Sequence, residues 1–166
     1  MLRKLLRFTN LFVNGVNTGI ALSHALQAPQ KAKLDRRSYL AAQQNLYLRY
    51  GRAATALEPG ALFSSLALAL LEHRRRGSSL PMLVSAGCIA AEVAVWKVLI
   101  DPINQQVAQW DPDRMPPEWP RLRDRWHTLH RVRASLTATA LAASIVSTLR
   151  APDAKAGGWS AFLRAA

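Results

Sequence analysis

The chain has 166 residues, of which half are apolar and 19% are charged, and its formal net charge is +12. A chain of this length has room for one domain. The arginines form short clusters between apolar runs, as at membrane helix ends, rather than one basic stripe. This pattern argues against nucleic acid as a partner, and the single cysteine, Cys88, excludes an intrachain disulfide.

Four apolar stretches follow one another, each close to the ~20 residues that cross a bilayer core. They cover residues 5–27, 53–72, 80–100 and 126–149. We therefore predict an all-α integral membrane four-helix bundle as one domain, residues 1–150, with a flexible tail at 151–166. The alternative, a soluble four-helix bundle, is disfavoured because the third stretch is apolar nearly all round.

The first apolar stretch follows the basic start MLRK, as a secretory signal would. Asn10, Asn14 and Asn17 interrupt the apolar run, and no clear cleavage motif follows. The pattern favours a retained first helix over a signal that is removed.

The connections between the stretches differ in character. Residues 31–54 carry tyrosines and leucines at loose helical spacing, which predicts an interfacial helix or an extension of the second span. The segment EHRRRGSS, residues 72–79, predicts a tight basic hairpin. Residues 101–125 contain several prolines and tryptophans, which predicts a long ordered loop with aromatic side chains at the membrane interface.

The distribution of basic residues also gives an expected orientation. The cluster of Arg3, Lys4 and Arg7 and the run at residues 74–76 fall on one side of a bundle with an even number of spans. By the positive-inside rule this side is cytoplasmic. The expected location is a bacterial inner membrane with both termini in the cytoplasm.

Ionisable side chains inside the third and fourth stretches form the first candidate site. In antiparallel helices Glu92 lies about 12 Å below one end and Arg133 about 10 Å below the adjacent end. The same count pairs Trp96 with His130. Intramembrane charges of this kind are costly and by default indicate function.

The remaining polar residues fall on the same half of the predicted bundle. Asn10, Asn14, Asn17 and His24 share one stripe of the first helix, and Glu58 enters the second span from the side of the long loop. We expect a polar pocket that opens toward residues 101–125, and an opposite half with almost no polar features. The alternative is a purely structural ion pair between Glu92 and Arg133.

Two other patterns concern a possible metal or haem site and the packing of the first helix. His24 and His130, with Glu58 or Glu92, could ligate a metal or haem, but there is no cysteine pair and no H-E-x-x-H motif, so we expect neither metal nor cofactor. Gly15 and Gly19 form a G-x-x-x-G motif, which favours close helix packing within the bundle or between copies of a homo-oligomer.

Several short motifs together resemble one family. They are ALEPG at residues 56–60, Trp96, Pro102 and Asn104 in VWKVLIDPIN, WDPD at residues 110–113, and Arg125, Trp126, His130 and Arg133. The chain resembles the DUF1772 family of small membrane proteins, which includes the anthrone oxygenases of polyketide pathways. The resemblance implies a four-helix membrane protein whose characterised relatives oxidise an anthrone to an anthraquinone with O2 as co-substrate, without metal or flavin.

This chemistry assigns roles to the candidate residues. Oxygenation without a cofactor requires a base and a group that stabilises the substrate anion. His130 is the expected base, Arg133 the expected anion stabiliser, and Glu92 orients Arg133. For a hydrophobic aromatic substrate, Trp96 and Trp126 provide apolar walls and Asn104 and Asn17 hydrogen-bond a carbonyl, with His24 and Glu58 completing the substrate-binding set.

Two other functions remain open. The protein could be a non-catalytic membrane protein that binds a lipid-like or quinone-like molecule, or an assembly subunit in which the polar residues only hold the helices together. A transporter is less favoured, since the sequence shows no inverted repeat.

Overall fold

The computed structural model describes residues 2–73 and 79–150, and within them the side chains of all but residues 48–54. The tail at 151–166 and the arginines of the predicted hairpin, residues 74–76, lie outside the described residues. The described chain consists of helices joined by short turns and contains no strand. The all-α prediction is confirmed for this part of the chain.

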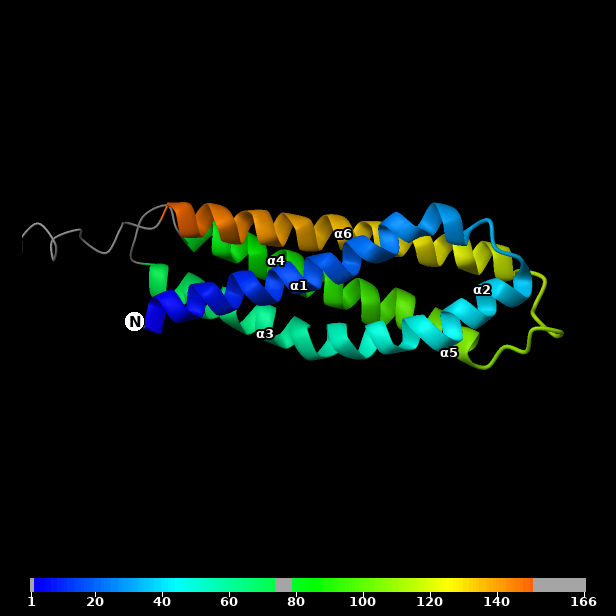
Figure 1. Cartoon of the computed structure of the whole chain (residues 1–166). Helices are drawn as coiled ribbons and strands as arrows, with labels where there is room; N and C mark the ends of the chain where they lie inside the picture. Colours follow the sequence, from blue (N-terminus) through cyan, green and yellow to red (C-terminus); the bar gives the residue numbers. More distant parts are fainter. Residues whose placement is uncertain (1, 74–78, 151–166) are drawn as a thin grey trace, which may run out of the picture.

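Helices α1, α3, α4 and α6 are long and run side by side (Figure 1). In chain order the elements are α1 (Leu2–Lys31), α2 (Arg36–Ala42), the π-helix η1 (Gln43–Tyr47), α3 (Leu48–Glu72), α4 (Ser79–Val95), the π-helix η2 (Trp96–Ile100), α5 (Asp101–Ala108) and α6 (Trp119–Leu149).

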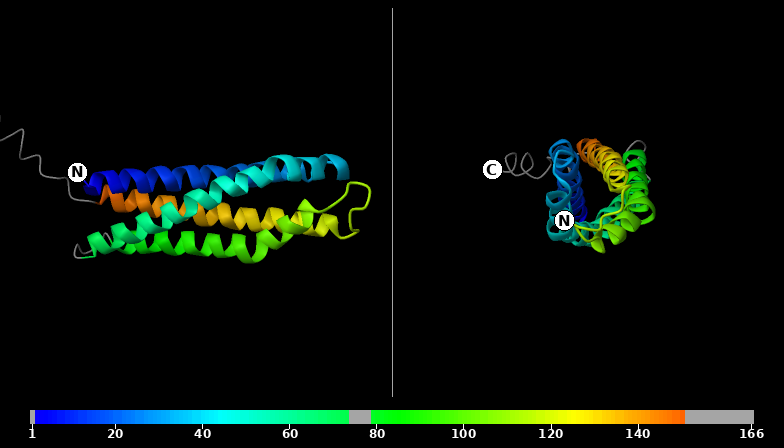
Figure 2. Two further views of the ribbon diagram at one scale, coloured as in Figure 1. Left: turned by 90° about the horizontal axis from the view of Figure 1, so that it is seen from below. Right: turned by 90° about the vertical axis from the view of Figure 1, so that its right-hand side faces the viewer.

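The four long helices close into a ring. Helix α6 packs on α4 and α1, and α3 packs on the same two helices, as the end-on view in Figure 2 shows. The first residues of α1 and the last of α6 lie at one end of the bundle, which we call the terminal end. Helices α2 and α5 and residues 109–118 lie at the other, the loop end.

The connection after α1 continues directly into the second long helix. Asp35 caps α2 by accepting hydrogen bonds from the backbone N–H groups of Arg37 and Ser38. From there α2, η1 and α3 form one uninterrupted helical run. Of the two structures predicted for residues 31–54, the extension of the second helix is therefore the one observed.

The connection between α4 and α6 is shorter than predicted. Helix α4 continues through η2 and α5 to Ala108, so that only residues 109–118 remain outside a helix. The Asp101 N–H bonds the carbonyl of Trp96, five residues back, and Pro102 falls in the first turn of α5. Since proline is tolerated in a first helical turn, Pro102 does not end the helical run. Of the predicted loop at 101–125, residues 109–118 are confirmed as a loop and the remainder is helical.

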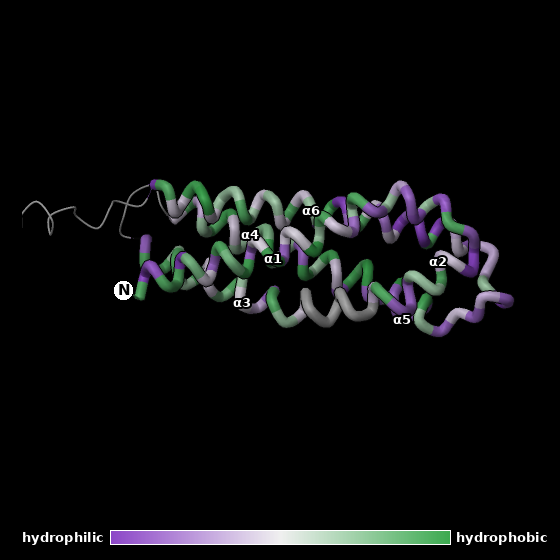
Figure 3. Tube along the Cα trace, viewed as in Figure 1, coloured by the Kyte–Doolittle hydropathy of each residue, from purple (hydrophilic) through white to green (hydrophobic). Residues whose placement is uncertain are grey.

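The bundle exposes apolar side chains and buries polar ones. Phe63, Leu70 and Val98 are 68%, 78% and 67% exposed, whereas Asn10 and Ser85 are 1% and 0% exposed. Hydrophilic residues gather mainly at the loop end of the bundle (Figure 3). Such an arrangement is typical of helices that pack through small and polar residues and face lipid with apolar ones.

Two helical runs, Ser79–Ala108 and Trp119–Leu149, are long and apolar enough to cross a membrane. They contain the third and fourth predicted spans. That α1 and α3 also cross stays a prediction, because both carry more polar residues along their length.

An apolar cluster fixes the loop end. Its buried members come from α2, η2, α5, the 109–118 segment and α6; they are Leu40, Ile100, Ile103, Val107, Met115 and Trp126. The cluster holds η1 and α5 against α6, and thereby positions the polar residues beneath it.

Gly15 and Gly19 do not mediate packing inside the bundle. A Cβ atom added at either glycine would meet nothing within 4 Å. Of the two kinds of packing predicted for this motif, the one within the bundle is wrong, because these glycines face outward. Packing between copies stays a prediction.

Candidate functional site

Arg133 is held by two glutamates in the middle of the loop half. Its Nε donates to Glu92 Oε2 at 2.7 Å, and its Nη2 donates to Glu58 Oε1 at 2.6 Å. The Arg133 and Glu58 side chains are only 6% and 5% exposed, and Glu92 is fully buried. The pairing of Glu92 with Arg133 is therefore as predicted, and Glu58 joins it as a second carboxylate.

Asn17 extends this group to the first helix. Its Nδ2 donates to Glu92 Oε1 at 2.8 Å, so that side chains of α1, α3, α4 and α6 meet at one depth. We call Asn17, Glu58, Glu92 and Arg133 the arginine clamp. If both carboxylates are ionised, the clamp carries a net charge of −1, so the positive charge of Arg133 is already matched.

Above the clamp, toward the loop end, lies a cluster of rings: His24, Tyr47, Trp126 and His130. The His130 ring stacks on Trp126, with ring centroids 3.7 Å apart. His24 meets His130 edge-on at 4.6 Å and lies 5.1 Å from Tyr47. We call these four residues the histidine–aromatic cluster.

The hydrogen bond of His130 determines which nitrogen is available for chemistry. Nδ1 lies 3.0 Å from the Trp126 backbone carbonyl. A carbonyl oxygen only accepts, so Nδ1 is the protonated nitrogen and Nε2 of the neutral ring carries the lone pair. Within the described part of the chain Nε2 has no hydrogen-bond partner, so it is free to accept a proton.

The two other predicted contact residues are already engaged. Asn104 Oδ1 accepts a hydrogen bond from Trp126 Nε1 at 2.9 Å, which ties α5 to α6. Trp96, in η2, packs on the apolar cluster of the loop end, whereas the ring stacked on His130 is Trp126. Roles of Asn104, Asn17 and Trp96 in substrate binding stay predictions.

Sequence reasoning missed Lys31, which is 6% exposed at the end of α1. Its Nζ donates to Gln43 Oε1 at 2.5 Å. The same nitrogen lies 3.3 Å from the Tyr47 ring centroid and 4.4 Å from that of Trp126. Burial lowers the pKa of Lys31 to about 7.

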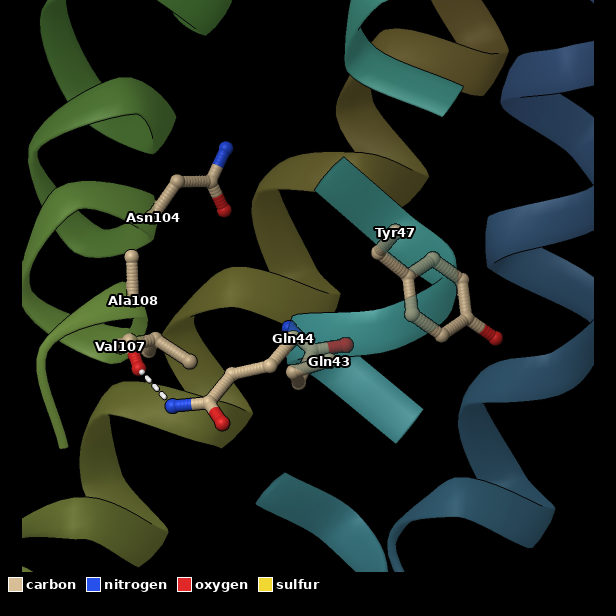
Figure 4. Close-up of a pocket in the computed structure, with 6 residues that line it drawn as sticks. All are labelled: Gln43, Gln44, Tyr47, Asn104, Val107 and Ala108. Carbon is tan, nitrogen blue, oxygen red and sulfur yellow. Dashed lines mark hydrogen bonds between the residues drawn. The ribbon is translucent and has the colours of Figure 1, made fainter. Parts of the chain in front are cut away.

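Among the described side chains, the cavity that lies at the position of the expected polar pocket is small. It measures about 10 Å³ and is lined by Gln43, Gln44, Tyr47, Asn104, Val107 and Ala108. Figure 4 shows Gln44 reaching from η1 to the Val107 carbonyl of α5, at 3.0 Å. The cavity has room for about one water molecule.

A larger groove lies between α1 and α6. It measures about 250 Å³ and is lined by Ala25, Ala28, Pro29, Ala32, Asp124, His127, Thr128 and Arg131. His127 is 5% exposed, and neither of its ring nitrogens has a hydrogen-bond partner among the described residues. Its ring faces Trp126 and Tyr39, at 5.3 and 6.4 Å, so His127 lies next to the cluster but outside it.

The terminal half of the bundle contradicts the prediction of an almost featureless interior. Asn10 donates to Ser64 and Ser65, both at 2.9 Å. Ser85 bonds Ser65 at 3.1 Å and Ser144 at 3.0 Å. We call these five residues the serine–asparagine network. The serine hydroxyls of α3, α4 and α6 and the Asn10 amide of α1 thus hydrogen-bond one another across all four long helices.

A third polar group lies nearest the terminal end. The buried Glu72 accepts hydrogen bonds from Arg7 Nε at 3.1 Å and from Ser147 at 3.2 Å. The predicted basic cluster at the start of the chain thus sends Arg7 inward to a glutamate, which the prediction of a one-sided polar interior had left out.

No group of three or more His, Cys, Asp and Glu side chains within residues 2–73 and 79–150 is placed to ligate a metal ion. His24 and His130 face each other, while Glu58 and Glu92 bond Arg133. The prediction that the protein works without metal or other cofactor remains open to experiment.

The fold and site define a class: a small helical protein with an apolar exterior and a buried cluster of charged, histidine and aromatic side chains. The profile of the anthrone oxygenase family matches residues 46–146, more than half of the chain. The chain therefore belongs to this family, also known as DUF1772. No curated protein and no solved structure matches it.

Proposed function

We propose that the protein is a membrane-embedded, cofactor-independent oxygenase that acts on a flat, hydrophobic, anthrone-like molecule. The family membership supports the reaction class. The single observation that carries the proposal is Nε2 of His130, which has no hydrogen-bond partner among the described residues and belongs to a ring stacked against Trp126. A base next to an apolar aromatic face is what deprotonation of a flat aromatic methylene requires.

The reaction follows from the acidity of such a methylene. His130 Nε2 takes one of its two hydrogens as a proton, which leaves a delocalised enolate. The enolate gives its electron pair to O2 in forming a carbon–oxygen bond, and the resulting peroxide takes the proton back from His130. Loss of water, with the second hydrogen, leaves the quinone carbonyl, so one oxygen atom enters the product and the other leaves as water.

The arginine clamp and the rings have supporting roles in this proposal. Arg133, fixed by Glu58 and Glu92, holds the α6 turn that carries His130 against α3 and α4. Trp126 and Tyr47 provide the apolar walls. Since the exterior is apolar, a hydrophobic substrate and O2 both reach the site from the bilayer, where they are more soluble than in water.

The test is turnover of unsubstituted anthrone by the detergent-purified protein under ¹⁸O2. We expect anthraquinone carrying one ¹⁸O atom, with at least about a hundredfold loss of rate in His130→Gln. His127→Gln is the matched control, since His127 is buried on the same helix one turn away and lies outside the cluster. Equal rates for wild type and a folded His130→Gln would refute the proposal.

One observation favours a second function, that of a non-catalytic membrane protein or assembly subunit. All three charged groups of the arginine clamp are paired with one another and join α3, α4 and α6, as a purely structural device would. Under this alternative, changes at His130 and Arg133 abolish folding. Under the oxygenase proposal, His130→Gln abolishes turnover in a protein that is still folded.

A further inference from the structure

Lys31 differs from the other buried cation of the loop half in having no counter-ion. Arg133 pairs with two carboxylates. Lys31 makes no ion pair with any residue of the described chain, and its one hydrogen bond goes to the neutral amide of Gln43. A buried ammonium group without a carboxylate is costly, and the lowered pKa of Lys31 is the expression of that cost.

The surroundings of Lys31 fit one kind of ligand. Nζ of Lys31 lies over the Tyr47 ring and over the Trp126 ring, and these two rings stand nearly perpendicular to each other, at 79°. His130 stacks on the same Trp126 ring. A planar molecule with a negatively charged oxygen would stack its face on one of these two rings, meet the other with its edge, and supply the missing counter-charge. An aliphatic anion would meet the charge but not the aromatic faces.

Arg133 is poorly suited to this task, because its positive charge is already matched by Glu58 and Glu92. The oxygen of an enolate formed at His130 therefore needs another cation. Lys31 Nζ and the His130 ring both contact the Trp126 ring, and Lys31 is the one nearer the loop end of the bundle. It also lies outside residues 46–146, the segment matched by the family profile.

We propose that Lys31 is the anion-binding residue of this site, and that its ligands are planar hydroxy- or keto-aromatics held as phenolate or enolate, with the oxygen on Nζ in place of the Gln43 amide. The inference rests on the proposed function for the position of the reacting carbon. A three-ring ligand is far larger than the cavity of about 10 Å³ beside Gln43, so binding moves η1 outward. Single π-helical turns inside α-helices are frequent at functional sites.

The experiment is an absorbance titration with 1,8-dihydroxyanthraquinone, whose phenolate absorbs at longer wavelength than its phenol. Wild type at pH 7 is expected to bind the dye as phenolate. Lys31→Met is expected to lose the phenolate band and bind at least tenfold more weakly, because the counter-charge is gone. Lys31→Arg keeps the band, and the matched control Lys33→Met, on an exposed lysine two residues away, behaves as wild type.

Gln43→Leu provides a second, independent variant. It removes the group that competes with the ligand for Nζ, so we expect the phenolate band to persist and binding to tighten several-fold. The proposal is overturned if Lys31→Met shows the wild-type band and affinity, if Gln43→Leu abolishes the band, or if wild type binds the dye only as neutral phenol or not at all. Should Lys31→Met fail to fold, the Gln43→Leu titration decides.

The titration needs neither O2 nor turnover, so its failure is distinguishable from failure of the proposed function. If the protein turns over anthrone but the phenolate band does not depend on Lys31, the oxygenase proposal stands and the proposed role of Lys31 is refuted. If the phenolate band depends on Lys31 but anthrone is not turned over, the proposed anion-binding site stands and the oxygenase proposal is refuted.

Discussion

The two halves of the bundle both bury polar side chains, but of different kinds. In the terminal half, short neutral groups such as Asn10, Ser65 and Ser85 hydrogen-bond one another between helices. In the loop half, long ionisable groups and rings meet. Within the part of the chain that the structure describes, His130 Nε2 has no hydrogen-bond partner and Lys31 has no counter-ion. Neutral side chains whose hydrogen bonds are all made hold helices together. Buried ionisable side chains that lack a partner are costly, and they indicate a functional site.

The largest effect that tests this comparison is expected from Arg133→Leu. It removes the cation that pairs with Glu58 and Glu92 and leaves both carboxylates buried without a partner of opposite charge. The expected loss of unfolding free energy is about 3–5 kcal/mol. Thermal unfolding in detergent, followed by circular dichroism, measures this loss. Combining the change with Glu58→Gln and Glu92→Gln should recover most of it, because no buried charge is then left unpaired. A single variant as stable as the triple would mean that the clamp is not an ionic device.

Lys31 gives the next effect, which is visible in pH dependence. Its folded pKa is about 7, against an ordinary value of 10.5. Between those values the unfolded chain holds a proton that the folded chain lacks, so the free energy of unfolding rises with pH, by at most about 1.4 kcal/mol per pH unit. Thermal unfolding from pH 7 to 9 should show this rise in wild type and Lys33→Met.

The rise should be absent in Lys31→Met. Four elements bring titratable side chains near the amine; these are His24 on α1, Tyr39 on α2, Tyr47 on η1, and His127 and His130 on α6. Burial raises the pKa of Tyr39, which keeps that group out of the measured range. If wild type and Lys31→Met show the same slope, Lys31 is charged and solvated in the folded protein.

The sequence predicted the parts of the site that depend on helical spacing alone. Trp126, His130, Arg133 and Thr137 follow the spacing i, i+4, i+7 and i+11, which predicts one helix face, and all four are buried. Antiparallel counting brought Glu92 to the depth of Arg133, because both helices were taken to start at the same loop. These inferences need only a 3.6-residue period and the direction of the chain.

The sequence could not give the parts that depend on how helices continue past their apolar stretches. Lys31 was not singled out, because no pattern in the adjacent sequence indicates that η1 packs Tyr47 against it. The loop was predicted to begin at residue 101, because a π-turn just before Pro102 has no sequence signature. Ser85 was not singled out in the sequence, because a hydroxyl partner on another helix cannot be seen from one chain position.

Ser85→Ala probes the terminal half and should have a smaller effect. It removes the hydrogen bonds of Ser85 to Ser65 and Ser144, which together contribute about 1 kcal/mol. Thermal unfolding should shift by a few degrees, while turnover of anthrone and binding of the dye stay at wild-type levels. Loss of activity in a folded Ser85→Ala protein would connect the two halves functionally and break the comparison.

The smallest effect is expected at the surface of the loop end. Arg37 pairs with Asp113, but their side chains are 71% and 70% exposed. Solvent screens such a pair and ordering two long side chains offsets its attraction, so Arg37→Ala should change the unfolding free energy by less than about 0.5 kcal/mol. The same detergent unfolding assay, run beside Arg133→Leu, compares two arginine–carboxylate contacts that differ mainly in burial. If Arg37→Ala lost as much unfolding free energy as Arg133→Leu, residues 109–118, which carry Asp113, would depend on this contact to stay packed on the bundle. The exposure of a charged side chain would then not be enough to tell a structural charge from a functional one in this protein.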